Sequence, residues 1–341
     1  MSDFLKKLRK KIVFWGIVFL SMILIPILSV CKSDEKSALA FGLNTQLEKS
    51  GNTLEKKEKD GEYFKILDES SGEILKVPDK EFLIGVVASE MPAAFEEEAL
   101  KAQAVASYTY FCRARNKNIG KKDYDFTVNT KKQENYIKKE QMENKWGSNF
   151  EKYYGKIANV VESVFGEVIE DDGEPVLAVY HAMSSGKTEK SADVFGGDLK
   201  YLQSVESPGD KLVPGYESLV EVSLENFKAN LSKINKDCNF ESNPDSWVKN
   251  ITRTDAGMVK IINICGADFK GSEIRKAFCL RSSNFDINYD GNSDKFIFNV
   301  RGYGHGVGMS QQGAHYMAKN GNTYKQILTW YYPGTEIVKV K

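Results

Sequence analysis

The sequence predicts an α+β fold: mixed helices and antiparallel strands in a lobed ectodomain with a groove, behind an N-terminal transmembrane helix. Two observations predict it. Segments with helical periodicity and segments with strand periodicity are interleaved without the regular alternation that builds a parallel sheet. Residues 12–31 form an apolar run without a charge, whereas the rest of the chain mixes polar and apolar residues.

The composition limits the functions that are open to the chain. It has 341 residues, of which 41% are hydrophobic, and its 47 basic and 47 acidic side chains leave no net charge. This length suits one large domain or two lobes with a packed core. Nucleic acid is not expected as a partner, because proteins that bind it usually carry a clear basic excess.

Residues 12–31 are predicted to anchor the chain in the cell membrane. A helix of this length spans about 30 Å, the thickness of the hydrocarbon core. Residues 1–11 contain five basic side chains and form a predicted cytoplasmic tail, so the rest of a single-pass protein lies outside the cytoplasm. A cleaved signal peptide or a lipoprotein signal fits less well, because Val30 stands before Cys31 where both need a small residue.

The part after the anchor divides by composition. Residues 32–75 are polar and are predicted to be an extracytoplasmic linker. Residues 76–341 are predicted to form the functional domain. Within it, residues 116–150 are rich in lysine and weakly patterned, which indicates a long excursion or an inserted subdomain.

The first half of this domain is predicted to be mostly helical. Asp79 begins a helix that ends near Pro92, because proline cannot continue it. A second helix runs from Glu96 to Arg115, with glutamates in the first turn where the helix dipole favours them. Beyond it we expect a helix near 157–164, a turn at 171–173 and a strand at 176–180.

The second half is predicted to be mixed. We expect strands near 219–223, 258–265 and 295–301, and helices near 225–231 and 272–279. Residues 290–294 are interpreted as a hairpin turn, because Arg301 stands where a calcium-binding loop needs glutamate. After residues 302–310 come a helix to about residue 320, a second helix from 323 and a closing strand.

Glu90 is the candidate acid. It closes an apolar helix just before Pro92, where burial and the negative end of the helix dipole both favour a protonated carboxyl. Such a group can protonate a leaving oxygen near neutral pH. The alternative is a solvated residue at a helix end.

The second candidate region is the segment 302–310. Its alternate glycines would let backbone amides approach a ligand, and Ser310 can cap the following helix. A structural turn would explain the glycines, but not His305 and Gln311 beside them. Dinucleotide binding is not favoured, because no strand–helix–strand unit follows.

The third candidate region follows the strand that ends at His181. A polar loop at a strand end is a common place for a site, although His181 can also simply cap the strand. Ser184 and Lys187 have the serine–lysine spacing of penicillin-binding proteins. That interpretation fits poorly, because the serine would have to open a helix and the companion motifs are missing.

Together these regions resemble the SpoIID/LytB domain family, over roughly residues 76–341. The matching blocks are Ser89-Glu90-Met91-Pro92 with residues 98–106, Tyr180-His181 with residues 186–189, residues 302–311 with Gly313-Ala314, and residues 330–334. The resemblance implies a peptidoglycan lytic transglycosylase that acts in forespore engulfment during sporulation. It also implies two partners, a cell-wall amidase and a small membrane protein of the SpoIIP and SpoIIM types.

In such enzymes one acid protonates the glycosidic oxygen between N-acetylmuramic acid and N-acetylglucosamine. The muramic C6 hydroxyl then attacks C1 and leaves a 1,6-anhydro end. The resemblance assigns the acid to Glu90. The predicted substrate-binding residues, which would contact peptidoglycan glycan strands, are His181, Ser184, His305, Gln311, Ser310 and Gln103. The alternative function is a non-catalytic glycan-binding scaffold or an amidase activator, because part of the family is named for enhancing amidases.

Two departures from the family pattern stand out. Tyr108 occupies a position where the family usually has arginine, which is expected to affect the grip on substrate. Some members bind zinc in the segment that corresponds to residues 127–136, but this segment has neither cysteine nor histidine here. No metal or other cofactor is therefore expected. Whether any of the five cysteines pair stays open.

Overall fold

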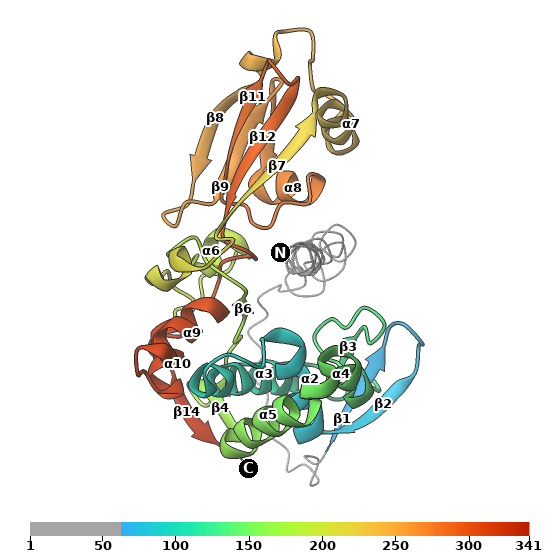
Figure 1. Cartoon of the computed structure of the whole chain (residues 1–341), viewed down its shortest axis with the longest axis vertical. Coiled ribbons are helices and arrows are strands. Elements are labelled where there is room, and N and C mark those ends of the chain that lie inside the picture. Colours follow the sequence, from blue (N-terminus) through green and yellow to red (C-terminus); the bar gives the residue numbers. More distant parts are fainter. Residues whose placement is uncertain (1–62, 341) are drawn as a thin grey trace, which may run out of the picture.

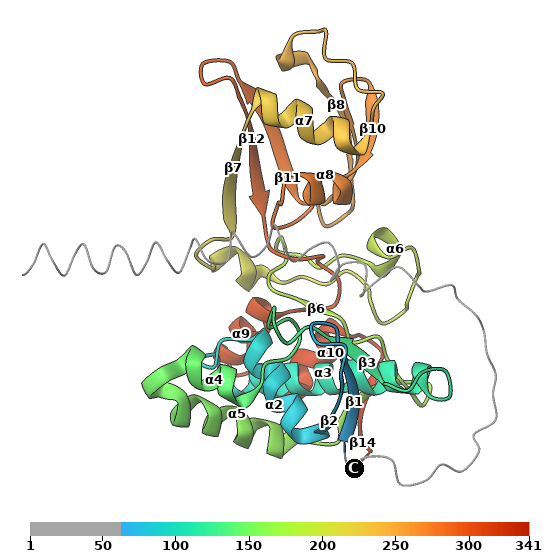
Figure 2. The same cartoon turned by 90° about the vertical axis from the view of Figure 1, so that its right-hand side faces the viewer.

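The computed structural model describes residues 63–340, which form two lobes joined by a central segment (Figures 1 and 2). The first lobe combines elements from both ends of the described chain, and the second is inserted between them. Each lobe has its own hydrophobic core, around Phe82 in the first and around Phe227 in the second. The mixed α+β class predicted from the sequence is confirmed, and so are its lobes.

The first lobe and the central segment contain most of the helices. Their elements are β1 (Tyr63–Asp68), β2 (Ile74–Pro78), α2 (Asp79–Glu90), α3 (Glu97–Asn118), β3 (Phe126–Val128), α4 (Lys139–Trp146), α5 (Phe150–Val164), β4 (Glu167–Asp171), β5 (Glu174–Pro175), β6 (Tyr180–His181), α6 (Ser191–Val194), η2 (Pro208–Leu212), β13 (Met309–Ser310), α9 (Gln311–Lys319), α10 (Tyr324–Tyr331) and β14 (Glu336–Lys339). The strands form the small sheets β2-β1-β3, β14-β4-β5 and β13-β6 at the edges of the helices.

The second lobe consists of two antiparallel sheets and two helices. Its elements are β7 (Glu217–Ser223), α7 (Leu224–Ile234), β8 (Val248–Arg253), β9 (Val259–Ile264), β10 (Ala267–Lys270), α8 (Gly271–Ala277), β11 (Phe285–Asp290) and β12 (Lys295–Arg301). The sheets have the orders β10-β9-β8 and β11-β12-β7. The turn at residues 290–294 joins β11 to β12, as predicted, with Asp290 opposite Lys295.

The helix α2 lies at the centre of the first lobe. Every residue from Phe82 to Ala88 is buried, because α2 is apolar on all sides and packs against α3, α4 and α5. It ends at Glu90, two residues before Pro92, as predicted. The predicted helices that became α3, α5, α9 and α10 are confirmed as well.

Two segments differ from the predictions. Residues 176–179 are buried for the most part but form no strand, because the amides of Ala178 and Val179 bond to carbonyls two residues earlier; only Tyr180 and His181 enter a sheet. Residues 63–75 fall within the predicted linker, yet they form β1 and the start of β2. Alternating burial along β1 shows that it belongs to the core.

The lysine-rich segment 116–150 belongs to the first lobe in the structure. Its strand β3 pairs in parallel with β1, and its helix α4 packs against α2 and α5. The predicted cytoplasmic tail, the anchor at residues 12–31 and most of the linker lie outside the described residues. Between residues 63 and 340, none of the helices is both long and apolar enough to cross a membrane.

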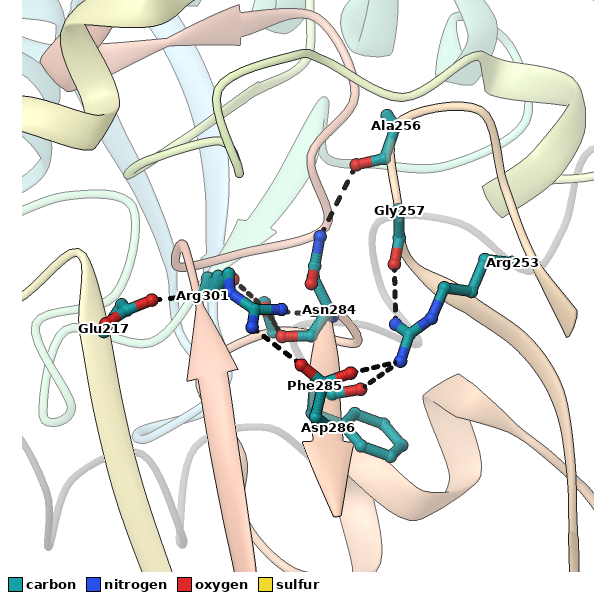
Figure 3. Close-up of polar contacts among 9 residues, drawn as sticks. Glu217, Arg253, Ala256, Gly257, Asn284, Phe285, Asp286 and Arg301 are labelled. Atoms are coloured by element: carbon teal, nitrogen blue, oxygen red, sulfur yellow. Dashed lines mark hydrogen bonds and ion pairs between the residues drawn. The ribbon is translucent and has the colours of Figure 1, made fainter. Parts of the chain in front are cut away.

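An ion-pair network holds the second lobe where the chain enters and leaves it (Figure 3). Asp286 accepts hydrogen bonds from Arg301 at 2.6 Å and from Arg253 at 2.7 Å, and Arg301 also lies 3.4 Å from Glu217. Arg253 then donates to the carbonyl of Gly257 at 2.9 Å. The network therefore fixes the loop 254–258, which contacts the central segment at Ser185 and Glu189.

The glycine-rich segment leads back from the second lobe, and Gly308 is its most constrained position. Its φ is +72°, and a Cβ there would overlap the carbonyl oxygen of Val179. We expect Gly308→Ala to destabilise the protein by about 3 kcal/mol or more, from backbone strain plus the clash. Gly334→Ala is the matched control: φ is +76° with nothing within 4 Å, so about 1 kcal/mol is expected. Thermal unfolding of both variants checks this difference, and equal melting temperatures would contradict it.

Candidate functional site

Glu90 is half-buried at the end of α2 and faces α9. Its Oε2 accepts a hydrogen bond from Gln311 Nε2 at 3.4 Å. Burial raises the pKa of Glu90 to about 7, although the bond from Gln311 and the charge of Lys145 pull the other way. The carboxyl can therefore keep its proton near neutral pH and release it there.

A chain of polar side chains leads from Glu90 into the core. Gln311 Nε2 also donates to Gln103 Oε1 at 3.3 Å, so both hydrogens of its amide are used. Gln103 donates to Ser107 Oγ at 2.9 Å, and Ser107 donates to the Tyr180 hydroxyl at 3.4 Å. This series of hydrogen bonds links residues from α2, α9, α3 and β6. It fixes the orientation of the Glu90 carboxyl.

Tyr180 belongs to this site, although no role was predicted for it from the sequence. Burial and the nearby Glu90 carboxyl both raise the pKa of its hydroxyl well above the ordinary value. The phenol therefore stays neutral and can act as a hydrogen-bond donor or acceptor. Its position within a recognisable block was the only sequence signal.

The glycines of the segment 302–310 allow close packing of protein on protein. A Cβ on Gly304 would lie 2.8 Å from His181 Cβ, and one on Gly306 would lie 2.8 Å from Met258 Cε. The space beside Gly304 and Gly306, where a ligand was expected to approach the backbone, is therefore occupied by side chains of the protein. The segment lies directly on residues 181–184 and so brings His181 and His305 together.

The rings of His181 and His305 lie 5.7 Å apart, measured between centroids. Burial lowers the pKa of His181 to about 4 and, together with the neighbouring His181, the pKa of His305 to about 3. Both rings are thus neutral at pH 7. His181 Nδ1 lies 3.1 Å from the carbonyl of Val307, which can only accept, so Nδ1 carries the proton. The buried Nε2 of His181 has no partner among the described residues and is an acceptor.

Ser184 and Ser310, both predicted to bind substrate, are fully buried and bond to a carboxylate of the protein. Each donates its hydroxyl to Asp210 in η2, and the Ser310 bond measures 2.8 Å. Ser310 Oγ also caps α9 by accepting from the amide of Gly313 at 3.1 Å. In this arrangement both hydroxyls are hydrogen-bonded within the protein. They hold the loop and the helix that carries Gln311.

Asp210 and Glu189 are two buried carboxyls whose roles the sequence analysis missed. Asp210 ties the loop after His181 to the start of α9. Glu189 accepts from Thr254 Oγ1 at 2.8 Å and from the amide of Met258 at 3.3 Å, so it joins the central segment to the loop 254–258 of the second lobe. Neither residue has a local signal, because both stand in irregular segments.

Two hollows of the described surface are lined by residues other than Glu90. One of about 380 Å³ lies between the segment 190–203 and the second lobe, and it is lined by Lys190, Asp193, Arg253 and Lys260, among others. A second, of about 230 Å³, lies beside β3. The groove predicted at Glu90 stays a prediction. Within residues 63–340, no cluster of three or more histidine, cysteine or acidic side chains could hold a metal. Cys112, Cys238 and Cys265 form no disulfide bond.

Comparison with known proteins gives consistent matches. A family model described as a stage II sporulation protein, SpoIID, matches residues 68–170. Stage II sporulation protein D of Bacillus subtilis (strain 168) is 35% identical over 264 residues, covering 76% of this chain and 74% of the relative. The protein of the same name from Bacillus amyloliquefaciens is 34% identical over 271 residues, covering 79% and 76%. The amidase enhancer of B. subtilis (strain 168) is 27% identical over 303 residues, covering 75% of this chain but 40% of the relative.

The fold and the site define a two-lobed α+β protein with a carboxyl of raised pKa at the end of a buried helix. The chain belongs to the SpoIID family of stage II sporulation proteins. The resemblance seen in the sequence blocks is thereby confirmed.

Tyr108, which stands where the family usually has arginine, lies away from the acid. Its hydroxyl is 3.5 Å from Asp79 Oδ2 at the start of α2, and Glu90 is at the other end, about 16 Å along the helix axis. Arg115, two turns further along α3, brings a guanidinium to 3.8 Å from the same Asp79 oxygen. The departure therefore falls in the packing of α2 on α3.

Proposed function

We propose that this chain is a membrane-anchored lytic transglycosylase that cleaves peptidoglycan glycan strands during forespore engulfment. The observation that carries the proposal is the state of Glu90: burial raises its pKa to about 7, and Gln311 holds it in place. Membership of the SpoIID family supports the setting in sporulation.

The proposed reaction needs one carboxyl. Glu90 gives its proton to the glycosidic oxygen as the bond from C1 of the muramic sugar breaks. The C6 hydroxyl of the same sugar forms the new bond to C1, and its proton returns to the Glu90 carboxylate. The acid is thus restored, no water is added, and the product carries a 1,6-anhydro end.

The surroundings of Glu90 favour this reaction over hydrolysis. Glycosidases that use water or a covalent intermediate need a second carboxyl about 5 to 9.5 Å away. Among residues 63–340, no second carboxyl is coupled to Glu90 strongly enough to shift its pKa, because the groups that do so are the amide of Gln311 and the ammonium of Lys145. The buried carboxyls Asp210 and Glu189 are engaged in holding loops.

His181, His305 and Gln311 are proposed to contact the glycan, with Gln103 acting through Gln311. Both rings are uncharged and His305 is half-buried; its Nδ1 accepts from the amide of Val307 at 3.1 Å, and the Nε2 of His181 is buried, so a sugar would contact the face or edge of the His305 ring. We further propose that residues 12–31 hold the domain at the outer face of the cell membrane. Its proposed partners there are an amidase and a small membrane protein of the SpoIIP and SpoIIM types.

A second candidate function is a glycan-binding scaffold or an activator of a cell-wall amidase. The similarity to a protein named amidase enhancer favours it, although this chain covers only 40% of that protein. In that case the polar chain at Glu90 would bind sugar without cutting it.

The mass of the products separates these functions. We expect the full-length protein in detergent to release, from purified glycan strands, fragments that are lighter than hydrolysis products by one water, about 18 Da, because the anhydro ring takes the place of added water. A parallel digest with a muramidase that hydrolyses the same bond provides the reference masses. Strands that co-sediment with the protein but stay intact would support the scaffold, and fragments of hydrolytic mass would contradict the proposed reaction.

A further inference from the structure

Lys145 is a cation beside the candidate acid, and it comes from the segment 116–150, whose role the sequence left open. It is the seventh residue of α4, whose last residue is Trp146. Its side chain reaches across to α2, where Nζ donates a hydrogen bond to the carbonyl of Ala88 at 2.9 Å. Ala88 is two residues before Glu90 in the last turn of α2.

The end of α2 explains why a lysine fits at this place. The carbonyl of Ala88 would normally accept from the amide four residues later, but that residue is Pro92, which has no N–H. Lys145 supplies the missing donor. Cations are also favoured at the C-terminal end of a helix, where the carbonyl dipoles leave partial negative charge.

The rest of α4 holds this lysine in position. Met142 is buried, and the side chain of Gln141 donates to the carbonyl of Thr130 at 2.8 Å. Gln141 Oε1 also accepts from the amide of Lys138 at 2.8 Å, which closes the first turn of the helix. The ammonium is therefore carried to the end of α2 by a fixed element.

The surroundings make Lys145 the main source of positive charge at the acid. Of the groups in the described structure that interact with Glu90, Gln311 is neutral and Tyr180 keeps its proton, because its pKa is raised well above the ordinary value. Lys145 is the cation among them. When Glu90 gives up its proton, the new negative charge meets this ammonium.

We propose that Lys145 is a positioning residue for proton transfer by Glu90: held by the orphan carbonyl of Ala88, its ammonium stabilises the carboxylate that forms when the glycosidic oxygen takes the proton. The inference rests on the proposed function. Lys145 keeps its own protons throughout, and it acts through charge. Burial of the ammonium lowers the pKa of Lys145, but much of the residue is exposed, so solvent screens the interaction and the effect is modest.

The test compares the titration of Glu90 in the full-length protein in detergent with that in three variants, Lys145→Met, Lys145→Arg and Lys139→Met. Carbon-13 NMR of labelled glutamate follows the titration of the Glu90 carboxyl, with Glu90→Gln to assign the signal. We expect Lys145→Met to raise the midpoint by about half a pH unit, and Lys145→Arg to leave it nearly unchanged, because the charge is kept. Lys139→Met is the matched control: it lies in the same helix, against the rings of Phe150 and Tyr154, and should cause no shift.

Kinetics give the second measurement. We expect Lys145→Met to lower kcat about threefold at pH 5.5 with little change in KM, and to move the alkaline limb of the pH profile upward. A variant that melts earlier but titrates like the wild type would show that Lys145 only caps α2, which would overturn the inference. The titration requires no glycan, so a wild-type protein without anhydro products would overturn the proposed function and leave this measurement intact.

Discussion

Glu90→Gln is expected to lower the release of anhydro-terminated fragments by about 10² to 10⁴-fold, the usual contribution of a general acid. The amide has the same shape but no proton of suitable acidity, so the leaving oxygen would depart as an unprotonated alkoxide. Glu97→Gln is the matched control, because Glu97 is exposed in the first turn of α3. Mass spectrometry of digested glycan strands measures both variants, and activity that survives in Glu90→Gln would contradict the assignment.

The same substitution is expected to change stability in a pH-dependent way. The pKa of Glu90 is raised from 4.5 to about 7 in the folded protein, so the folded state binds a proton that the unfolded state has already lost. Wild-type stability therefore falls as the pH rises from about 4.5 through 7, whereas Glu90→Gln removes this dependence. Above pH 7 the variant should be more stable by about 1–3 kcal/mol. A variant that is inactive because it is unfolded would instead melt earlier.

The wild-type activity follows from the same pKa. The acid must be protonated to act, so kcat/KM should fall as the pH rises past about 7. The two histidines are already neutral above pH 4 and so add no alkaline limb.

Glu90 could be predicted from sequence because its signals are local. An apolar helix, a proline two residues later and a carboxyl between them define both the end of the helix and the burial of the acid. The partners of this acid could not be predicted in the same way. Gln311 follows Glu90 by 221 residues, and its contact exists only because α9 packs on α3.

The bonds of Ser184 and Ser310 to Asp210 could not be predicted from sequence for a different reason. A hydroxyl beside glycines suits a ligand and a buried clamp equally well, and the deciding partner, Asp210, stands in an irregular segment without periodicity. Residues 176–180 are ambiguous in a similar way, because their sequence fits both a strand and a buried irregular segment. A short apolar run predicts burial reliably, but a strand also needs a neighbour to pair with, and the run finds one only at its last residues.

Asp210→Ala is expected to cost about 3 kcal/mol of stability, because buried donors would lose their shared acceptor. Asp210 is fully buried; its Oδ2 accepts from the Ser184 amide at 2.9 Å and from the Ser184 hydroxyl, while its Oδ1 accepts from Ser310 at 2.8 Å. Asp237→Ala, at an exposed position, should stay within about 0.5 kcal/mol of the wild type. Thermal unfolding compares the two.

Loss of Asp210 should also lower activity, because Asp210 bonds to Ser310, the N-cap of α9. Ser310 caps this helix and the next residue, Gln311, contacts the acid, so loosening the cap lets Gln311 move away from Glu90. We expect a lower kcat even at temperatures where Asp210→Ala is fully folded. Asp210→Asn keeps one acceptor oxygen and should fall between the wild type and Asp210→Ala in both measurements. If Asp210→Ala melted with the wild type, the carboxyl would not be the clamp that joins the loop after His181 to the helix of Gln311.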